Sequence, residues 1–155
     1  MIDIRAVIFD LDGVIVSTDE IHFRAWKQLA DAERIPFERA DNERLRGVSR
    51  MASLEIILER SPRVYDADEK CEMAERKNAA YGESLRFLSP ADLLPGVAAT
   101  LDDLRRLGIR IAIGSSSRNA GPILRAIGLD GAFDVVVDGT DIARSKPDPE
   151  VFTRA

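Results

Sequence analysis

Apolar residues recur along the chain in two patterns, one typical of strands and one typical of helices. Short aliphatic runs that end at polar or glycine residues predict strands at 4–9, 109–113 and 133–137. Apolar residues at helical spacing predict helices over 97–107 and 122–127, and a glycine suited to a helix C-terminus follows each. This alternation of strands and helices predicts a parallel sheet joined by right-handed crossovers.

The segment 17–89 has a different pattern. It contains no comparable strand, and its helical runs lie at 21–32, 53–60 and 68–88, the last two rich in charge. The sequence therefore predicts an α/β fold whose core comprises residues 1–16 and 90–155. Residues 17–89 are expected to form an all-helical cap domain inserted into that core.

Composition narrows the class of protein. The 155 residues carry a net charge of −5 without a basic run, which argues against nucleic acid as a partner. The single cysteine, Cys71, cannot form an internal disulfide, so a reducing compartment is expected. No apolar stretch approaches membrane-spanning length, and the N-terminus runs into a strand rather than a signal peptide. We expect a cytoplasmic protein with a small-molecule partner and no membrane partner.

Two aspartates, Asp10 and Asp12, follow the first predicted strand. In an extended chain the side chains of residues i and i+2 point the same way, and open α/β sheets bind ligands at the carboxyl ends of their strands. Two neighbouring carboxylates repel unless a cation or a shared proton relieves them, and a hard metal ion with oxygen ligands does so. The alternative is an Asx turn in which Gly13 supplies an unusual backbone angle. The pair by itself leaves both interpretations open.

The motif FDLDGVI at 9–15 resembles the first signature of the haloacid dehalogenase (HAD-like) superfamily of phosphotransferases. The similarity continues through HFRAW at 22–26, LRGVSR at 45–50, SSSRN at 115–119 and SKPDP at 145–149. The segments HFRAW at 22–26 and GVSR at 47–50 resemble the β-phosphoglucomutase family in particular. The resemblance implies a Rossmann-like core with a helical cap, Mg²⁺ as cofactor, and an isomerase of carbohydrate metabolism. Such an enzyme interconverts β-D-glucose 1-phosphate and β-D-glucose 6-phosphate through β-glucose 1,6-bisphosphate and a phosphorylated aspartate.

The resemblance also implies roles for catalytic residues. Asp10 is the expected nucleophile and Asp12 the general acid–base, and both are expected to bind the metal, Asp12 through its backbone carbonyl. Ser115 is expected to bind the transferring phosphoryl group, Lys146 to neutralise its charge and that of Asp10, and His22 to lie beside the acid–base aspartate. The alternatives are a serine-rich helix cap, a solvated surface lysine and a histidine that only packs.

Further residues are expected to bind the substrate by the same resemblance. Arg50 is expected to hold the phosphate that is not transferred, because guanidinium binds phosphate bidentately. The other expected substrate-binding residues are Gly47, Val48, Ser53, Lys77, Ser116, Ser117, Arg118 and Asn119. For Arg50 and Lys77 the alternative is an exposed helix charge.

One departure concerns the end of the sequence. The family continues after the segment around Phe152 with a helix and a strand that carries two acidic magnesium ligands, which residues 153–155 do not supply. Asp138 and Asp141 precede Lys146 and are interpreted as turn or cap residues. We therefore expect either a fragment of a longer protein or an incomplete metal site. A monomer is expected for a full-length member, and oligomers or aggregates for a truncated chain.

Two alternative functions follow. One is a sugar-phosphate phosphatase, in which water attacks the same aspartyl phosphate. The other is an inactive fragment that still binds phosphosugars.

Overall fold

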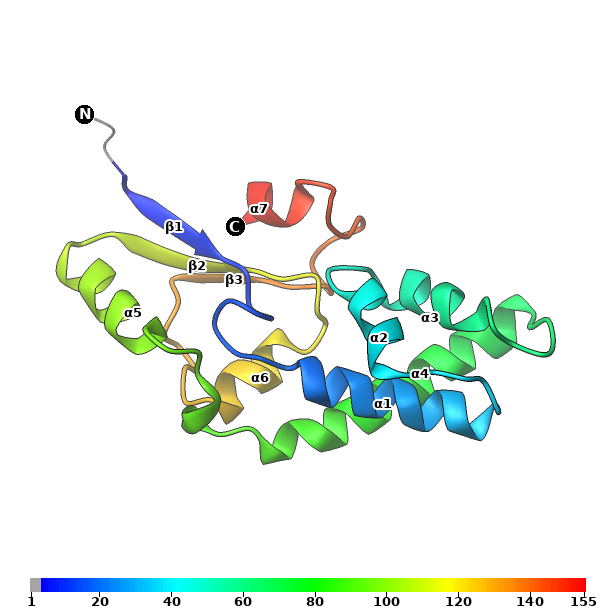
Figure 1. Ribbon diagram of the computed structural model, residues 1–155. Helices are drawn as coiled ribbons and strands as arrows, with labels where there is room; N and C mark the ends of the chain where they lie inside the picture. The colour runs from blue at the N-terminus through cyan, green and yellow to red at the C-terminus, as the bar shows by residue number, and fades with distance from the viewer. Residues whose placement is uncertain (1–3) are drawn as a thin grey trace. The chain divides into compact units, whose positions relative to one another are not determined.

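The computed structural model describes residues 4–155, which form two compact units (Figure 1). One unit contains the chain up to Thr18 together with Leu85–Ala155, and the other is Asp19–Ser84. The second unit thus begins two residues later and ends five residues earlier than the predicted cap domain.

The first unit is built on a parallel sheet. Its strands are β1 (Ala6–Phe9), β2 (Arg110–Gly114) and β3 (Val135–Val137), in the order β1-β2-β3. Ala112 of β2 pairs with Ile8 on one side and Val135 on the other. Because the strands are parallel, their carboxyl ends meet at one edge of the sheet. The predicted parallel-sheet α/β fold is confirmed.

Helices cover both faces of this sheet. Figure 1 shows α5 (Val97–Arg106) and α6 (Ala120–Ala126) on one side and α7 (Glu150–Arg154) on the other. Gly108 follows α5 with a φ of +69°, the left-handed conformation that suits a glycine after a helix. Two short 3-10 turns, η2 (Leu85–Phe87) and η3 (Pro90–Asp92), precede α5. The core between sheet and helices is formed by Leu101, Ile111, Ile113, Ile123 and Ile127, each at most 2% exposed.

Strand β1 is less buried than predicted. It begins at Ala6 rather than Ile4, and Ile8 remains 37% exposed. Among the strands that the structure describes, β1 pairs with β2 alone, whereas β2 has a neighbour on each side. This explains why Ile111–Gly114 of β2 are buried while β1 alternates between exposed and partly buried residues.

The second unit is entirely helical, as predicted. Its elements are α1 (Asp19–Ala32), α2 (Arg39–Asn42), η1 (Glu43–Leu45), α3 (Arg50–Leu58) and α4 (Ala67–Ser84). Its core includes Trp26, Leu29, Phe37, Leu54 and Met73.

Helix α3 begins three residues before its predicted start. The Ser49 hydroxyl accepts a hydrogen bond from Ala52 N (3.3 Å), so it caps the helix. Across residues 4–155, we find no helix with the length and apolar character needed to cross a membrane.

Candidate active site

Asp10 and Lys146 form an ion pair in the first unit. Lys146 Nζ lies 2.8 Å from Asp10 Oδ1, and the backbone N–H of Leu11 donates to the same oxygen at 2.8 Å. The Lys146 side chain is only 19% exposed, so its interpretation as a solvated surface group is wrong. The pair places a carboxylate directly after β1 with a cation beside it. This is the charge balance that attack on an anionic phosphoryl group requires.

Asp12 is held by a neighbouring hydroxyl. The buried Thr18 donates a hydrogen bond from Oγ1 to Asp12 Oδ1. Gly13 has a φ of +79°, and its N–H donates to Val16 O at 2.8 Å. The unusual backbone angle that the alternative assigned to Gly13 is therefore present, beside an Asp12 carboxylate that Thr18 orients.

The serines after β2 accept hydrogen bonds from backbone N–H groups of their own loop. Ser115 is 1% exposed, and its hydroxyl oxygen accepts from Ser117 N at 3.1 Å. The Ser117 hydroxyl in turn accepts from Asn119 N at 3.2 Å, just before α6. These bonds lie within the loop, and Asn119 occupies the N-cap of α6 without a side-chain capping bond, so the serines do not cap the helix. Each hydroxyl keeps a hydrogen that can be donated to a ligand.

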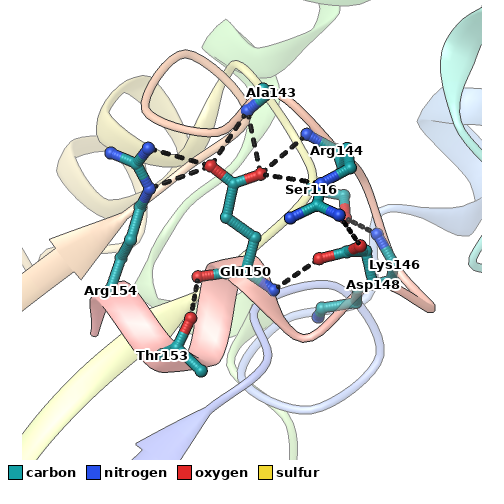
Figure 2. A network of polar contacts seen from close by, with 8 residues as sticks. All are labelled: Ser116, Ala143, Arg144, Lys146, Asp148, Glu150, Thr153 and Arg154. Carbon is teal, nitrogen blue, oxygen red and sulfur yellow. Dashed lines mark hydrogen bonds and ion pairs between the residues drawn. The ribbon is translucent and has the colours of Figure 1, made fainter.

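Ser116 connects this loop to Lys146. Its hydroxyl accepts from the backbone N–H of Lys146 at 3.3 Å (Figure 2). Arg118 is exposed and Asn119 is partly exposed. The structure therefore gathers Asp10, Ser116 and Lys146 at the carboxyl edge of the sheet, with Arg118 exposed in the same loop.

The carboxylates match the chemistry of a magnesium site in part. Asp10 and Asp12 offer the oxygen ligands that this cation prefers. Within residues 4–155, however, no group of three or more His, Cys, Asp or Glu side chains is arranged to hold a metal ion. Asp138 and Asp141 close a turn on each other, with Asp138 N donating to Asp141 Oδ2 at 2.8 Å, so their interpretation as turn residues is confirmed. Among the described residues Asp10 and Asp12 are therefore candidate ligands, and no larger cluster of such side chains accompanies them.

In the second unit, His22 and Lys77 lie in contact. Lys77 Nζ is 3.0 Å from His22 Nδ1, and it lies over the rings of Trp26 and Tyr81 at 4.8 and 4.6 Å. Lys77 is 4% exposed, so its interpretation as an exposed helix charge is wrong.

This environment keeps His22 neutral. Burial, and secondarily the Lys77 charge, lowers the pKa of His22 to about 3. With Nδ1 accepting from the Lys77 ammonium, the imidazole proton is assigned to Nε2. His22 therefore offers a hydrogen-bond donor rather than a group that titrates near neutral pH.

Arg50 begins α3 and is mostly buried. Its Nη2 lies 3.3 Å from Glu75 Oε1, whereas its Nη1 is buried without a hydrogen-bond partner. The side chain is 21% exposed, which excludes a fully solvated helix charge. A buried donor without a partner is costly, and an anion would satisfy it.

The remaining predicted residues of this unit have mixed environments. Gly47 has a φ of +71°, so the turn before α3 needs glycine for its backbone conformation. Val48 N donates to Leu45 O at 3.2 Å and closes that turn. Ser53 is buried, at 3% exposure. The proposed contacts of these three residues with a substrate stay predictions.

Sequence reasoning missed three residues that contact the predicted ones. Thr18 binds Asp12, Glu75 pairs with Arg50, and Glu150 holds the loop that carries Lys146. Arg50 and Glu75 lie on different helices, whereas Thr18 and Glu150 each lie six residues from their partners. None of these pairs lies within one helix or strand, where regular spacing would predict the contact.

Known proteins similar to this chain include phosphosugar mutases and phosphatases. The family model described as haloacid dehalogenase-like hydrolase matches residues 4–155. β-Phosphoglucomutase of Bacillus subtilis is 48% identical over 97% of this chain, and the match covers 68% of that protein. A phosphorylated carbohydrates phosphatase of Thermotoga maritima is 32% identical over 96% of this chain and 67% of its own length. The chain thus spans about two thirds of the length of these relatives.

A solved structure of a β-phosphoglucomutase is also similar to this chain. A crystal structure of β-phosphoglucomutase from Clostridium difficile is 38% identical, with a TM-score of 0.90 over 97% of this chain and 69% of that one. The resemblance inferred from the motifs, including that to β-phosphoglucomutases, is confirmed. On the match of the family model to residues 4–155, and on 48% identity to a β-phosphoglucomutase over 97% of the chain, the chain belongs to the haloacid dehalogenase-like hydrolase family.

Proposed function

We propose that this protein is a phosphosugar mutase that interconverts β-D-glucose 1-phosphate and β-D-glucose 6-phosphate through β-glucose 1,6-bisphosphate. The observation that carries the proposal is the Asp10–Lys146 ion pair at the end of β1, in a chain 48% identical to a β-phosphoglucomutase. The oriented carboxylate, Asp10, supports covalent transfer, because aspartate is a competent nucleophile toward phosphorus.

The proposed chemistry divides two roles between the aspartates. An Asp10 oxygen attacks the phosphorus of the bisphosphate, the bond from phosphorus to the sugar oxygen breaks, and Asp12 gives that oxygen its proton. In the second half-reaction the 6-hydroxyl of β-glucose 1-phosphate attacks the aspartyl phosphate while Asp12 takes its proton. The bond from phosphorus to Asp10 breaks, which frees Asp10 and forms the bisphosphate again. The hydrogen bond from Thr18 supports the Asp12 role, because it orients the carboxylate.

The neighbouring groups handle charge. Lys146 neutralises Asp10 and the transferring phosphoryl group, while the hydroxyls of Ser115 and Ser116 donate to the phosphoryl oxygens. Asp10 and Asp12 would hold Mg²⁺ together with ligands that residues 4–155 do not show, and when bound the ion supplies further neutralisation of the phosphoryl oxygens. In this proposal Ser117, Arg118 and Asn119 bind the sugar phosphate.

For the cap residues we propose substrate binding rather than proton transfer. Arg50 binds the phosphate that is not being transferred, which its buried and unpartnered Nη1 supports. His22 donates through Nε2, with Lys77 holding the ring in the required tautomer.

The second candidate is a sugar-phosphate phosphatase, because a phosphatase of phosphorylated carbohydrates is among the relatives. Both functions can be followed at once by ³¹P NMR with β-glucose 1-phosphate and a trace of the 1,6-bisphosphate. A mutase produces glucose 6-phosphate faster than inorganic phosphate. Release of inorganic phosphate as the main product would replace the mutase proposal with the phosphatase one.

A further inference from the structure

Glu150, the first residue of α7, lies at the centre of a network of polar contacts (Figure 2). Its carboxylate accepts from the backbone N–H of Arg144 at 2.9 Å and from that of Ala143 at 3.2 and 3.3 Å. Arg154, one turn along α7, donates to Oε1 from Nε at 3.0 Å. The side chain is only 12% exposed, and these donors, Ala143 N first, lower the pKa of Glu150.

The same glutamate is tied to the far end of the loop 143–148. Its backbone N–H donates to Asp148 Oδ1 at 3.0 Å, and Asp148 Oδ2 lies 3.0 Å from Arg144 Nη1. Glu150 thus contacts both ends of this loop, whereas Lys146 lies at its middle. Lys146 itself is bound at two points, through its N–H to Ser116 and through Nζ to Asp10.

We propose that Glu150 is a positioning residue for phosphoryl transfer: its carboxylate holds the loop 143–148 in the conformation that keeps the Lys146 ammonium on Asp10. The proposal rests on the proposed function, because it concerns the same Asp10. Lysine has a long side chain with high rotamer entropy. The position of its ammonium therefore depends on how firmly the backbone of the loop is held. A carboxylate that accepts two backbone N–H groups is a strong way to hold a loop that has no regular secondary structure.

The competing explanation is that Glu150 only stabilises α7 through its i, i+4 pair with Arg154. The chain offers a matched control for this. Arg154→Ala removes the helix pair but leaves both bonds to the backbone of the loop. Glu150→Gln removes the charge and weakens the bonds to the loop while keeping the size of the side chain.

The first test is steady-state kinetics on β-glucose 1-phosphate. Glu150→Gln is expected to lower kcat about 10- to 100-fold, the usual cost of losing a group that orients an active-site residue. KM should change little, since the Glu150 carboxylate is bound to the loop and to Arg154. Glu150→Asp, which keeps the charge, should recover part of the loss, and Arg154→Ala should retain most of the activity. Equal losses for Glu150→Gln and Arg154→Ala would overturn the proposal.

A double-mutant cycle with Lys146→Ala separates positioning from general stability. If Glu150 acts through Lys146, Glu150→Gln lowers kcat in the wild type but not in the Lys146→Ala background. Thermal unfolding should show the same loss of stability in both backgrounds. An equal fall in kcat in both backgrounds would show that Glu150 does not act through Lys146.

A crystal structure of Glu150→Gln tests the positioning role separately from the proposed function. The Lys146–Asp10 pair should be lost or disordered in that variant and present in the wild type, whatever reaction the wild type catalyses. A wild type without turnover would refute the proposed function alone. A Glu150→Gln structure in which the pair persists at its wild-type distance would refute the positioning role alone.

Discussion

Lys146 Nζ lies 2.8 Å from Asp10 Oδ1, although the two residues come from opposite ends of the sequence. The contact arises because β1 places Asp10 at the carboxyl edge of the parallel sheet, where the loop that carries Lys146 also lies. Ser116, which follows β2, binds the backbone of that loop. The charge balance that the proposed phosphoryl transfer needs is therefore assembled by three segments that meet only in the folded chain.

Replacing the nucleophile should abolish transfer and leave the fold nearly intact. Asp10→Asn keeps the shape of the side chain, but the amide is a poor nucleophile, so kcat should fall by about 10⁴-fold or more. The measurement is turnover of β-glucose 1-phosphate together with radiolabelling of the protein by a phosphoryl donor. Asp12→Asn is the matched control, since it should lose turnover while Asp10 can still be labelled. Normal turnover by Asp10→Asn would exclude Asp10 as the nucleophile.

Lys146→Ala should reduce kcat by about 10²- to 10³-fold, the cost of losing one electrostatic contact to the reacting group. Arg144→Ala is the matched control, because Arg144 is a cation of the same loop whose side chain is 72% exposed and paired with Asp148. The comparison is made by steady-state kinetics at saturating bisphosphate. If both variants lost the same activity, the effect would belong to the loop rather than to the ammonium on Asp10.

Arg50→Ala should impair the mutase reaction far more than slow hydrolysis of the substrate. The mutase must hold the bisphosphate by the phosphate that is not reacting, and hydrogen bonds to charged groups contribute about 1.5–3 kcal/mol each. Mutase turnover should therefore fall by about 10²-fold or more. ³¹P NMR gives both products in one assay.

Arg44→Ala is the control for Arg50, since it removes an exposed arginine of the same unit that pairs with Glu59. Equal losses of mutase and phosphatase activity in Arg50→Ala would favour the phosphatase proposal.

Acid should destabilise the protein through His22. Its pKa is about 3 in the folded chain because of burial and the Lys77 charge, and its ordinary value is 6.5. Between these values the unfolded state binds a proton that the folded state does not, so the free energy of unfolding falls as the pH drops from 6.5 towards 3. Above 6.5 this contribution is complete and independent of pH.

Urea unfolding of the wild type and of His22→Asn at pH 7 and pH 4.5 measures this effect. The wild type should lose about 2–3 kcal/mol more than the variant between the two pH values. Glu20, whose pKa is lowered to about 2 by hydrogen bonds from Arg39 and then Arg24, also loses stabilisation in acid, but it does so in both proteins. Identical pH dependence in both proteins would mean that His22 is not held neutral.

The periodicity of the sequence by itself determined the elements of the core. Apolar spacing at Val97, Leu101 and Leu104 is a local property, and α5 forms over Val97–Arg106 with Gly108 after it. The division into a parallel-sheet unit and a helical unit also followed from local pattern, since residues 17–89 contain no run comparable to the predicted strands. Short elements such as α2 were missed, because four residues carry too little periodicity to indicate a helix.

Tertiary structure alone decided the environments of the site residues. For Lys77 the sequence left an exposed helix charge open as an alternative to substrate binding, but His22, Trp26 and Tyr81 surround its ammonium. Glu150 and Thr18 contact loop residues six positions away, which irregular backbone brings back to them. Burial, hydrogen-bond partners and pKa depend on which segments meet in space, and spacing along the chain carries no information about that. The sequence therefore identified the chemical groups, whereas packing decided which of them are paired, neutral or held in place.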